Sequence, residues 1–117
     1  MIPKCRIYCY ETQGMIVAND YEELSELFMA LNTDDSMFSE PMQSTGLLDK
    51  KGNDIFEGDV VEVFDSRYAV FYDNENASFR LKPRDKRWNT DYMSNYAHEA
   101  SFEIIGNIYQ NKELVEG

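Results

Sequence analysis

The most distinctive charged group in this sequence is a short basic run that ends on its single tryptophan. Residues 80–88 read RLKPRDKRW, and residues 80–87 carry a net charge of +4. Arg and Trp are enriched at interface hot spots, and basic loops with an aromatic ring bind phosphate and stack on bases. The run therefore predicts a contact surface, with these candidate binding residues: Arg80, Lys82, Arg84, Lys86, Arg87 and Trp88. The alternative is a solvated strand end and loop whose charges neutralise nearby carboxylates.

The two cysteines and the single histidine are the other residues suited to chemistry. Cys5 and Cys9 are four residues apart, so in a strand they face the same way about 13 Å apart, too far for a disulfide. Zinc would need two further ligands, and the chain adds only His98. We therefore expect buried thiols, no bound metal, no cofactor and no catalytic residues. A nucleophilic pair of a cysteine with His98 stays open, because His98 can lie anywhere in the fold.

Acidic residues adjoin glycines at several expected corners of the chain. Four glycines fall where a tight turn or a bulge is predicted: Gly46, Gly52, Gly58 and Gly106. Such corners favour glycine because it adopts positive φ freely. Asp49 and Asp59 lie beside them, where a carboxylate can accept backbone N–H bonds. Their spacing is not that of a calcium loop, so we expect a structural role rather than metal or acid–base chemistry.

The apolar pattern predicts a mainly β chain with one helix. Residues 21–31 form that helix, because Asp20 can cap it and apolar residues from Leu24 to Leu31 recur at helical spacing. A hairpin is expected over residues 4–17. Short strands with glycine turns follow from residue 42, which is typical of a small barrel or sandwich. A short helix covering one end of the barrel is suggested by three aromatic residues four apart: Trp88, Tyr92 and Tyr96.

Length, composition and charge limit the classes of function. The chain has 117 residues, of which 43% are hydrophobic, enough to fill the core of one domain over 1–117. No apolar run reaches the roughly 18 residues of a membrane span, and Lys4 and Arg6 interrupt the first stretch, so we expect a soluble cytoplasmic protein without a signal peptide. The net charge is −11. That field repels nucleic acid, whose binding depends on cations that neutralise phosphates.

Two motifs resemble the YopX family of small phage and prophage proteins. Residues 42–60 (MQSTGLLDKKGNDIFEGDV) are similar to the family's central signature, and residues 104–114 (IIGNIYQNKEL) to its C-terminal ending. The resemblance covers essentially the whole chain, as a single YopX-like domain, except that residues 82–100 have no clear counterpart. It implies a mostly β fold, an SH3-like barrel with added elements, in proteins mostly of Gram-positive hosts. It brings no established activity and no catalytic residues.

These observations together predict a phage or prophage accessory protein that is not an enzyme. We expect a non-catalytic protein-binding module that acts on a host or phage protein in the bacterial cytoplasm. The larger acidic field favours the acidic surface as the working face, toward a basic partner. The alternative is a nucleic-acid-contacting protein that uses the basic loop 80–88, against the opposing net charge.

Overall fold

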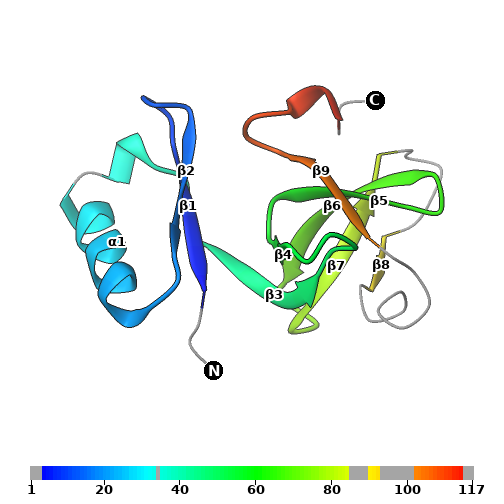
Figure 1. The fold of residues 1–117 in the computed structure, drawn as a ribbon, viewed down its shortest axis with the longest axis horizontal. Helices are drawn as coiled ribbons and strands as arrows, with labels where there is room; N and C mark the ends of the chain where they lie inside the picture. Colours follow the sequence, from blue (N-terminus) through cyan, green and yellow to red (C-terminus); the bar gives the residue numbers. More distant parts are fainter. Residues whose placement is uncertain (1–3, 34, 85–89, 93–101, 115–117) are drawn as a thin grey trace. The chain divides into compact units, whose positions relative to one another are not determined.

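The chain folds into two compact units, Met1–Ser44 and Thr45–Gly117. The structure is a computed structural model, and it describes residues 4–33, 35–84, 90–92 and 102–114 (Figure 1). The strands form two sheets, in the orders β2-β1-β3-β4 and β8-β7-β6-β5-β9. Strand β3 (Met42–Leu48) begins in the first unit and ends in the second. The described chain is mainly β with a single α-helix, which confirms the predicted class.

The first unit packs a helix on a β-hairpin. Its hairpin strands are β1 (Cys5–Cys9) and β2 (Gly14–Ala18), which pair antiparallel, and the start of β3 pairs with the other side of β1. The helix is α1 (Tyr21–Thr33), followed by the 3-10 turn η1 (Asp35–Met37). The buried side chains of helix and hairpin form one core: Cys5, Ile7, Ala18, Leu24 and Leu27.

Helix α1 begins at the cap that the sequence predicts. The Glu23 N–H donates to Asp20 Oδ1 at 2.8 Å, and Glu23 Oε1 accepts the Asn19 N–H at 3.2 Å. This reciprocal pair is a variant of the capping box, which satisfies backbone donors that have no partner inside the helix. The helix runs to Thr33, two residues beyond the predicted end, and the Thr33 hydroxyl donates to the Met29 carbonyl at 2.9 Å.

The second unit is built on the five-stranded antiparallel sheet. Its strands are β5 (Asp59–Val63), β6 (Ser66–Asp73), β7 (Ser78–Pro83), β8 (Asp91–Tyr92) and β9 (Glu103–Asn107). Strand β4 (Asp54–Phe56) precedes β5, and the 3-10 turn η3 (Lys112–Leu114) follows β9. One face of this sheet contributes to a second core, whose buried residues are Ile55, Val61, Val63, Tyr68, Val70, Leu81 and Phe102.

The expected helix downstream of the basic run is wrong at Tyr92. This residue lies in β8, paired with Arg80 of β7, because the edge of β7 offers backbone partners that an aromatic spacing in the sequence does not reveal. The other two residues of that prediction, Trp88 and Tyr96, lie outside the described residues.

Three of the four glycines have the positive φ that the predicted tight turns require. Gly46, Gly52 and Gly58 have φ of 81°, 86° and 83°, where an L side chain is strained. Gly106 is different, because its φ is not positive and its requirement is space. A Cβ on Gly106 would lie 2.6 Å from Asn111 Oδ1 and 2.7 Å from Leu114 Cδ1. The register between β5 and β9 shifts next to Gly106, which confirms the predicted bulge.

Candidate functional site

The basic run begins on the face of β6–β7 that points away from the core. Strand pairing sets Phe71 opposite Arg80 and Ala69 opposite Lys82, while their neighbours Val70 and Leu81 enter the core on the other face. The ladder continues one pair further, because the Arg84 N–H donates to the Arg67 carbonyl at 2.9 Å. Six residues make up this outer face: Arg67, Ala69, Phe71, Arg80, Lys82 and Arg84.

The C-terminal turn covers the neighbouring part of the same sheet side. Val60, which pairs with Ala69, has 0% of its surface exposed. The turn that follows β9 is held by Asn107, whose Oδ1 accepts the N–H groups of Tyr109 (3.0 Å) and Gln110 (2.8 Å). The Ile108 N–H donates to the Gly58 carbonyl at 2.8 Å, which anchors Ile108 beside β6. The turn therefore forms a wall next to the outer face.

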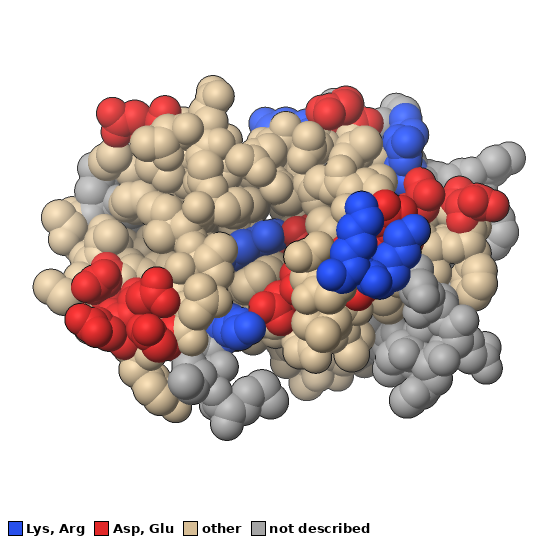
Figure 2. Space-filling view, viewed as in Figure 1, with Lys and Arg blue, Asp and Glu red and all other residues tan. Residues whose placement is uncertain are grey.

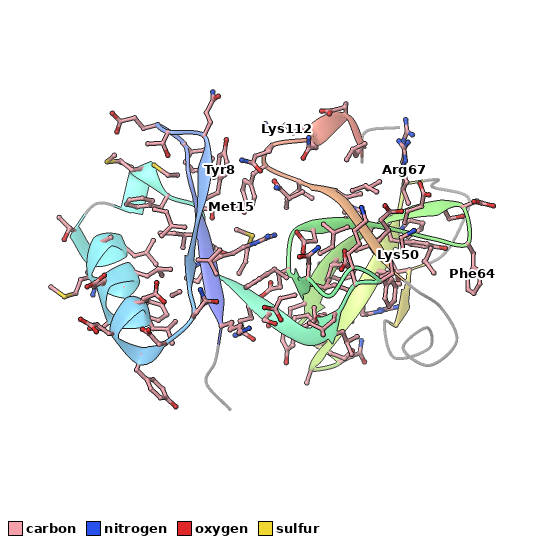
Figure 3. All side chains as sticks on the ribbon, in the orientation of Figure 1. Tyr8, Met15, Lys50, Phe64, Arg67 and Lys112 are labelled. Carbon is pink, nitrogen blue, oxygen red and sulfur yellow. The ribbon has the colours of Figure 1, made fainter. Side chains whose placement is uncertain are left out.

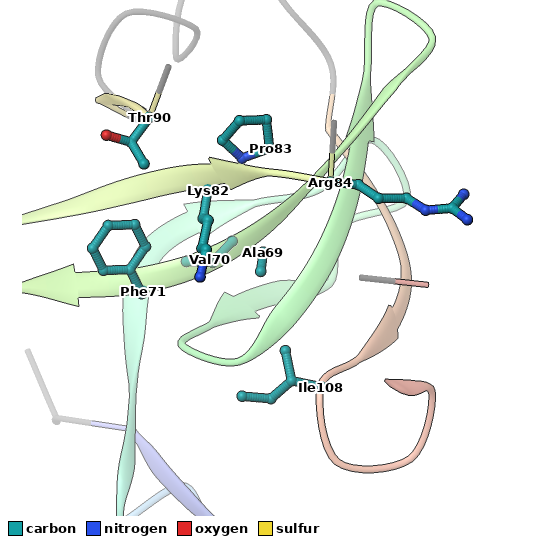
Figure 4. A pocket seen from close by; sticks show the side chains of 8 residues that line it. All are labelled: Ala69, Val70, Phe71, Lys82, Pro83, Arg84, Thr90 and Ile108. Carbon is teal, nitrogen blue, oxygen red and sulfur yellow. The ribbon is translucent and has the colours of Figure 1, made fainter. Parts of the chain in front are cut away.

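A hollow of about 600 Å³ lies between this wall and the strands (Figure 4). Most of its lining is apolar and comes from Ala69, Val70, Phe71, Pro83 and Ile108. Lys82, Arg84 and Thr90 supply the polar part of the lining. Figure 4 shows Lys82 among the other lining residues, whereas Arg84 points away from them. An apolar hollow with a few polar groups is the usual form of a ligand or anchor site.

Arg80 differs from the other cations of the outer face because its charge is balanced. Its Nη1 lies 3.1 Å from Asp73 Oδ2, and the two side chains are only 20% and 13% exposed. Its Nη2 donates to Thr90 Oγ1 at 2.9 Å. Asn76 and then Arg80 donate hydrogen bonds to Asp73 and, together with backbone N–H groups, hold the pKa of that carboxyl below its usual value. Arg80 therefore ties β6, β7 and Thr90 together.

Lys82 and Arg84 are exposed, and no residue in the described ranges forms an ion pair with them. Arg67 lies next to Arg84 in the ladder, so two like charges face each other across the strands, an arrangement that is destabilising. Glu62 of β5 lies opposite Arg67 on its other side, without an ion pair at salt-bridge distance. Figure 3 shows Arg67 extending away from the sheet. Three of the four cations of the outer face, Arg67, Lys82 and Arg84, therefore have no carboxylate at ion-pair distance within the described residues.

The structure assembles half of the predicted binding residues. Arg80, Lys82 and Arg84 share one face, but Arg80 is a structural residue and the other two border the hollow. Lys86, Arg87 and Trp88 lie outside the described residues. Sequence reasoning missed the apolar lining and one neighbouring cation, including Arg67, Ala69, Phe71 and Ile108. For Arg67, Ala69 and Phe71, the sequence signal was the alternation of side chains between the two faces of β6. This alternation can be assigned once residues 73–76 are taken as the turn of a hairpin.

The carboxylates beside the glycine corners hold backbone, which confirms the structural interpretation. Asp49 Oδ1 accepts the N–H groups of Lys51 (2.9 Å) and Asn53 (2.8 Å). Burial raises the pKa of Asp49, but hydrogen bonds from the N–H groups of Asn53, Ile104 and Lys51 outweigh it and lower the pKa overall. Asp59 Oδ2 accepts the Phe56 N–H at 2.8 Å.

The remaining candidates for chemistry are the two cysteines, which the structure describes, and the single histidine. Cys5 and Cys9 are buried free thiols, as expected, and His98 lies outside the described residues. Within the ranges that the structure covers, no cluster of three or more His, Cys, Asp or Glu side chains is placed to hold a metal. Over the same ranges, none of the helices combines the length and the apolar character needed to cross a membrane.

Acidic side chains also gather locally. The exposed face of α1 carries Glu22, Glu23 and Glu26, and Figure 2 shows an acidic group over this helix. On the second unit, the same view shows a group of Lys and Arg side chains next to acidic ones, as in the pairs of Lys50 (3.0 Å) and Lys51 (3.5 Å) with Glu103. None of these six residues lines the hollow, and those of the second unit are paired with one another.

Comparisons with known proteins address the fold and the family. The family model described as YopX protein matches residues 1–116. Among solved structures, the crystal structure of protein EF1440 from Enterococcus faecalis is similar, with a TM-score of 0.63 and 23% sequence identity over 99% of each chain. At this identity the likeness concerns the fold alone. None of the curated proteins searched matches the chain.

Proposed function

Because this chain belongs to the YopX protein family, we propose that it is a phage or prophage accessory protein that works as a non-catalytic protein-binding module. Its target is a host or phage protein in the bacterial cytoplasm. The finer fold assignment belongs to the same proposal: the second unit is a variant of the SH3-like barrel, a fold that serves many binding functions. The family resemblance supports this assignment.

One observation carries the proposal: the hollow on the outer face of β6–β7. It joins apolar lining from Ala69, Phe71 and Ile108 to the exposed cation of Lys82, for which the described residues supply no carboxylate. Interfaces gain most of their binding energy where an anchor side chain fills such a pocket beneath a polar rim. A non-catalytic role is supported by Asp49, Asp59 and Asp73, which are engaged in holding the backbone or Arg80.

Of the two surfaces that the sequence offers, this geometry supports the basic one. The acidic residues of α1 are solvated on an exposed helical face, whereas Lys82 borders a hollow that an incoming group can fill. The second candidate function, contact with nucleic acid, is favoured by the same cations. It is opposed by the net charge of −11, which repels phosphates at long range.

Affinity capture from a bacterial host lysate tests the proposal with a matched pair of variants. Lys82→Glu reverses the charge at the hollow, and Lys112→Glu makes the same change on η3, where the exposed Lys112 is not a lining residue (Figure 3). The expected result is a protein retained by wild type and Lys112→Glu after nuclease treatment and lost with Lys82→Glu. Retention that disappears with nuclease favours nucleic acid. Equal retention by all three proteins rejects this site.

A further inference from the structure

The outer face changes from neutral to cationic along its strands. Three cross-strand pairs follow one another: Phe71 with Arg80, Ala69 with Lys82, and Arg67 with Arg84. Asp73 balances the charge of the first pair at 3.1 Å. The other two pairs carry three cations, and the described ranges supply no ion-pair partner for any of them. Positive charge therefore increases from the Phe71 end of the hollow toward Arg84.

The apolar lining extends along the strands and reaches the neutral end at Phe71. Phe71 and Ala69 form part of the strand side of the hollow, and Ile108 stands on the turn beside them. A volume of about 600 Å³ is within the range of about 300–1,000 Å³ in which proteins bind compact ligands or side chains. Burying one large aliphatic or aromatic side chain there would strengthen binding by about 10- to 100-fold. The hollow therefore offers an anchor point next to a positive strip.

From this order we infer that the hollow binds an acidic peptide segment of the partner, which holds one apolar side chain in the hollow and carboxylates beside Lys82 and Arg84. The inference rests on the proposed protein-binding function and adds the chemistry of the partner. Residues that share one face of an extended chain are about 6.6 Å apart. An extended peptide lying along the strands would therefore carry its acidic residues two and four positions from the apolar one.

A nucleic acid fits this surface less well than such a peptide. Sites for single strands stack successive bases on several aromatic rings, whereas Phe71 is the one aromatic residue among the described lining residues. The net charge of −11 opposes a polyanion more strongly than a peptide with two or three carboxylates. The peptide also gains from burial of its apolar side chain, a contribution that phosphates do not supply.

Selection from a library of random peptides of about a dozen residues tests the inference. The library is selected on wild type and counter-selected on Lys82→Glu, and enriched peptides are labelled and titrated by fluorescence anisotropy. We expect an apolar residue with Asp or Glu two and four positions from it, on one side in the peptide sequence. Binding should weaken at least about tenfold in Lys82→Glu and change less than about twofold in Lys112→Glu. Ala69→Phe, which fills the hollow without changing charge, should also abolish binding while the melting temperature confirms folding.

Several outcomes would overturn the inference. Enrichment of basic or purely apolar peptides would do so, as would acidic peptides that bind Lys82→Glu as well as wild type. Tighter binding of a labelled oligodeoxythymidylate that depends on Lys82 would assign the surface to nucleic acid instead. If no acidic peptide binds while the captured lysate protein still depends on Lys82, the inference fails and the proposed function stands. If acidic peptides bind as expected but lysate capture is indifferent to Lys82, the proposed function fails at this site, while the preference of the hollow for acidic peptides stands.

Discussion

Arg84 is bound by its backbone to Arg67, and this hydrogen bond of 2.9 Å sets two arginine side chains beside each other at the end of the β6–β7 ladder. Pro83, which precedes Arg84, is the one residue of β7 that has no N–H to donate. The bond from Arg84 therefore continues the pairing beyond it. The strand end is thus well held, while its two like charges repel. Such an arrangement costs stability in the isolated protein and becomes favourable when an anion lies between the charges.

The first prediction follows from this repulsion. Arg84→Glu converts a like-charge pair into an opposite pair, so the free energy of unfolding should rise by about 0.2–1 kcal/mol. Thermal unfolding should show a melting temperature higher by a few degrees. Arg84→Gln, the neutral control, should lie between the two proteins. A lower melting temperature for Arg84→Glu would contradict the assignment of Arg67 as its neighbour.

Gly58 and Gly106 should both resist substitution, but for different reasons. Gly58→Ala places a side chain at φ 83°, which costs about 1–2 kcal/mol and lowers the melting temperature by several degrees. Gly58→Asn should recover part of this loss, because Asn tolerates positive φ. At Gly106 the order reverses, and Asn should be worse than Ala, since the larger side chain meets Asn111 and Leu114. The same order at both positions would refute one of the two explanations.

Asp49 should make the stability depend on acid pH. Hydrogen bonds in the folded state lower its pKa, so its contribution is complete above the ordinary aspartate pKa. That contribution is lost as the pH falls through the folded value, below about pH 4. Urea unfolding between pH 6 and pH 3 should show a smaller pH dependence in Asp49→Asn than in wild type. A residual dependence is expected, because hydrogen bonds also lower the pKa values of Asp73 and Glu103. Identical pH profiles would contradict this role for Asp49.

Substitutions in the turn between β5 and β6 should raise the melting temperature of the protein. Phe64 and Asp65 have φ of 50° and 60°, the pattern of a two-residue type I′ turn, for which Asn-Gly is the favoured pair. Phe64 is also 70% exposed, at the tip of the hairpin (Figure 3). The double variant Phe64→Asn, Asp65→Gly should therefore raise the melting temperature by several degrees, since strain at a bulky residue with positive φ is removed. An unchanged or lower value would mean that Phe64 stabilises the turn by packing.

Local patterns in the sequence were sufficient for helix α1 but not for the site. The stripe that includes Leu24 and Leu27 and the cap at Asp20 predict α1, because both depend on neighbours within a few residues. The end of β5 was less visible, since Phe64 looks like a strand residue and lacks the usual composition of its turn. Sequence also could not separate Arg80 from Lys82. Their difference depends on Asp73 and Thr90, which strand pairing brings to Arg80 alone.

The hollow itself has the weakest sequence signal. Ala69 and Phe71 are apolar strand residues like those of the core, and only the pairing of β6 with β7 assigns them to the outer face. Ile108 comes from a turn far along the chain, and its place beside β6 depends on the hydrogen bond to Gly58. The basic run includes part of β7, one of the strands that line the hollow, while long-range packing decides which of its residues border that hollow.

The position of β3 has a consequence for recombination between relatives. The two units meet after Ser44, inside this strand, whereas domain boundaries usually fall in exposed loops. A crossover that exchanges one unit must therefore join two half-strands without gaining or losing a residue. One extra residue at the junction would move each later side chain of β3 to the opposite side of the sheet. Exchange of one unit is thus restricted to parents whose β3 segments are equal in length.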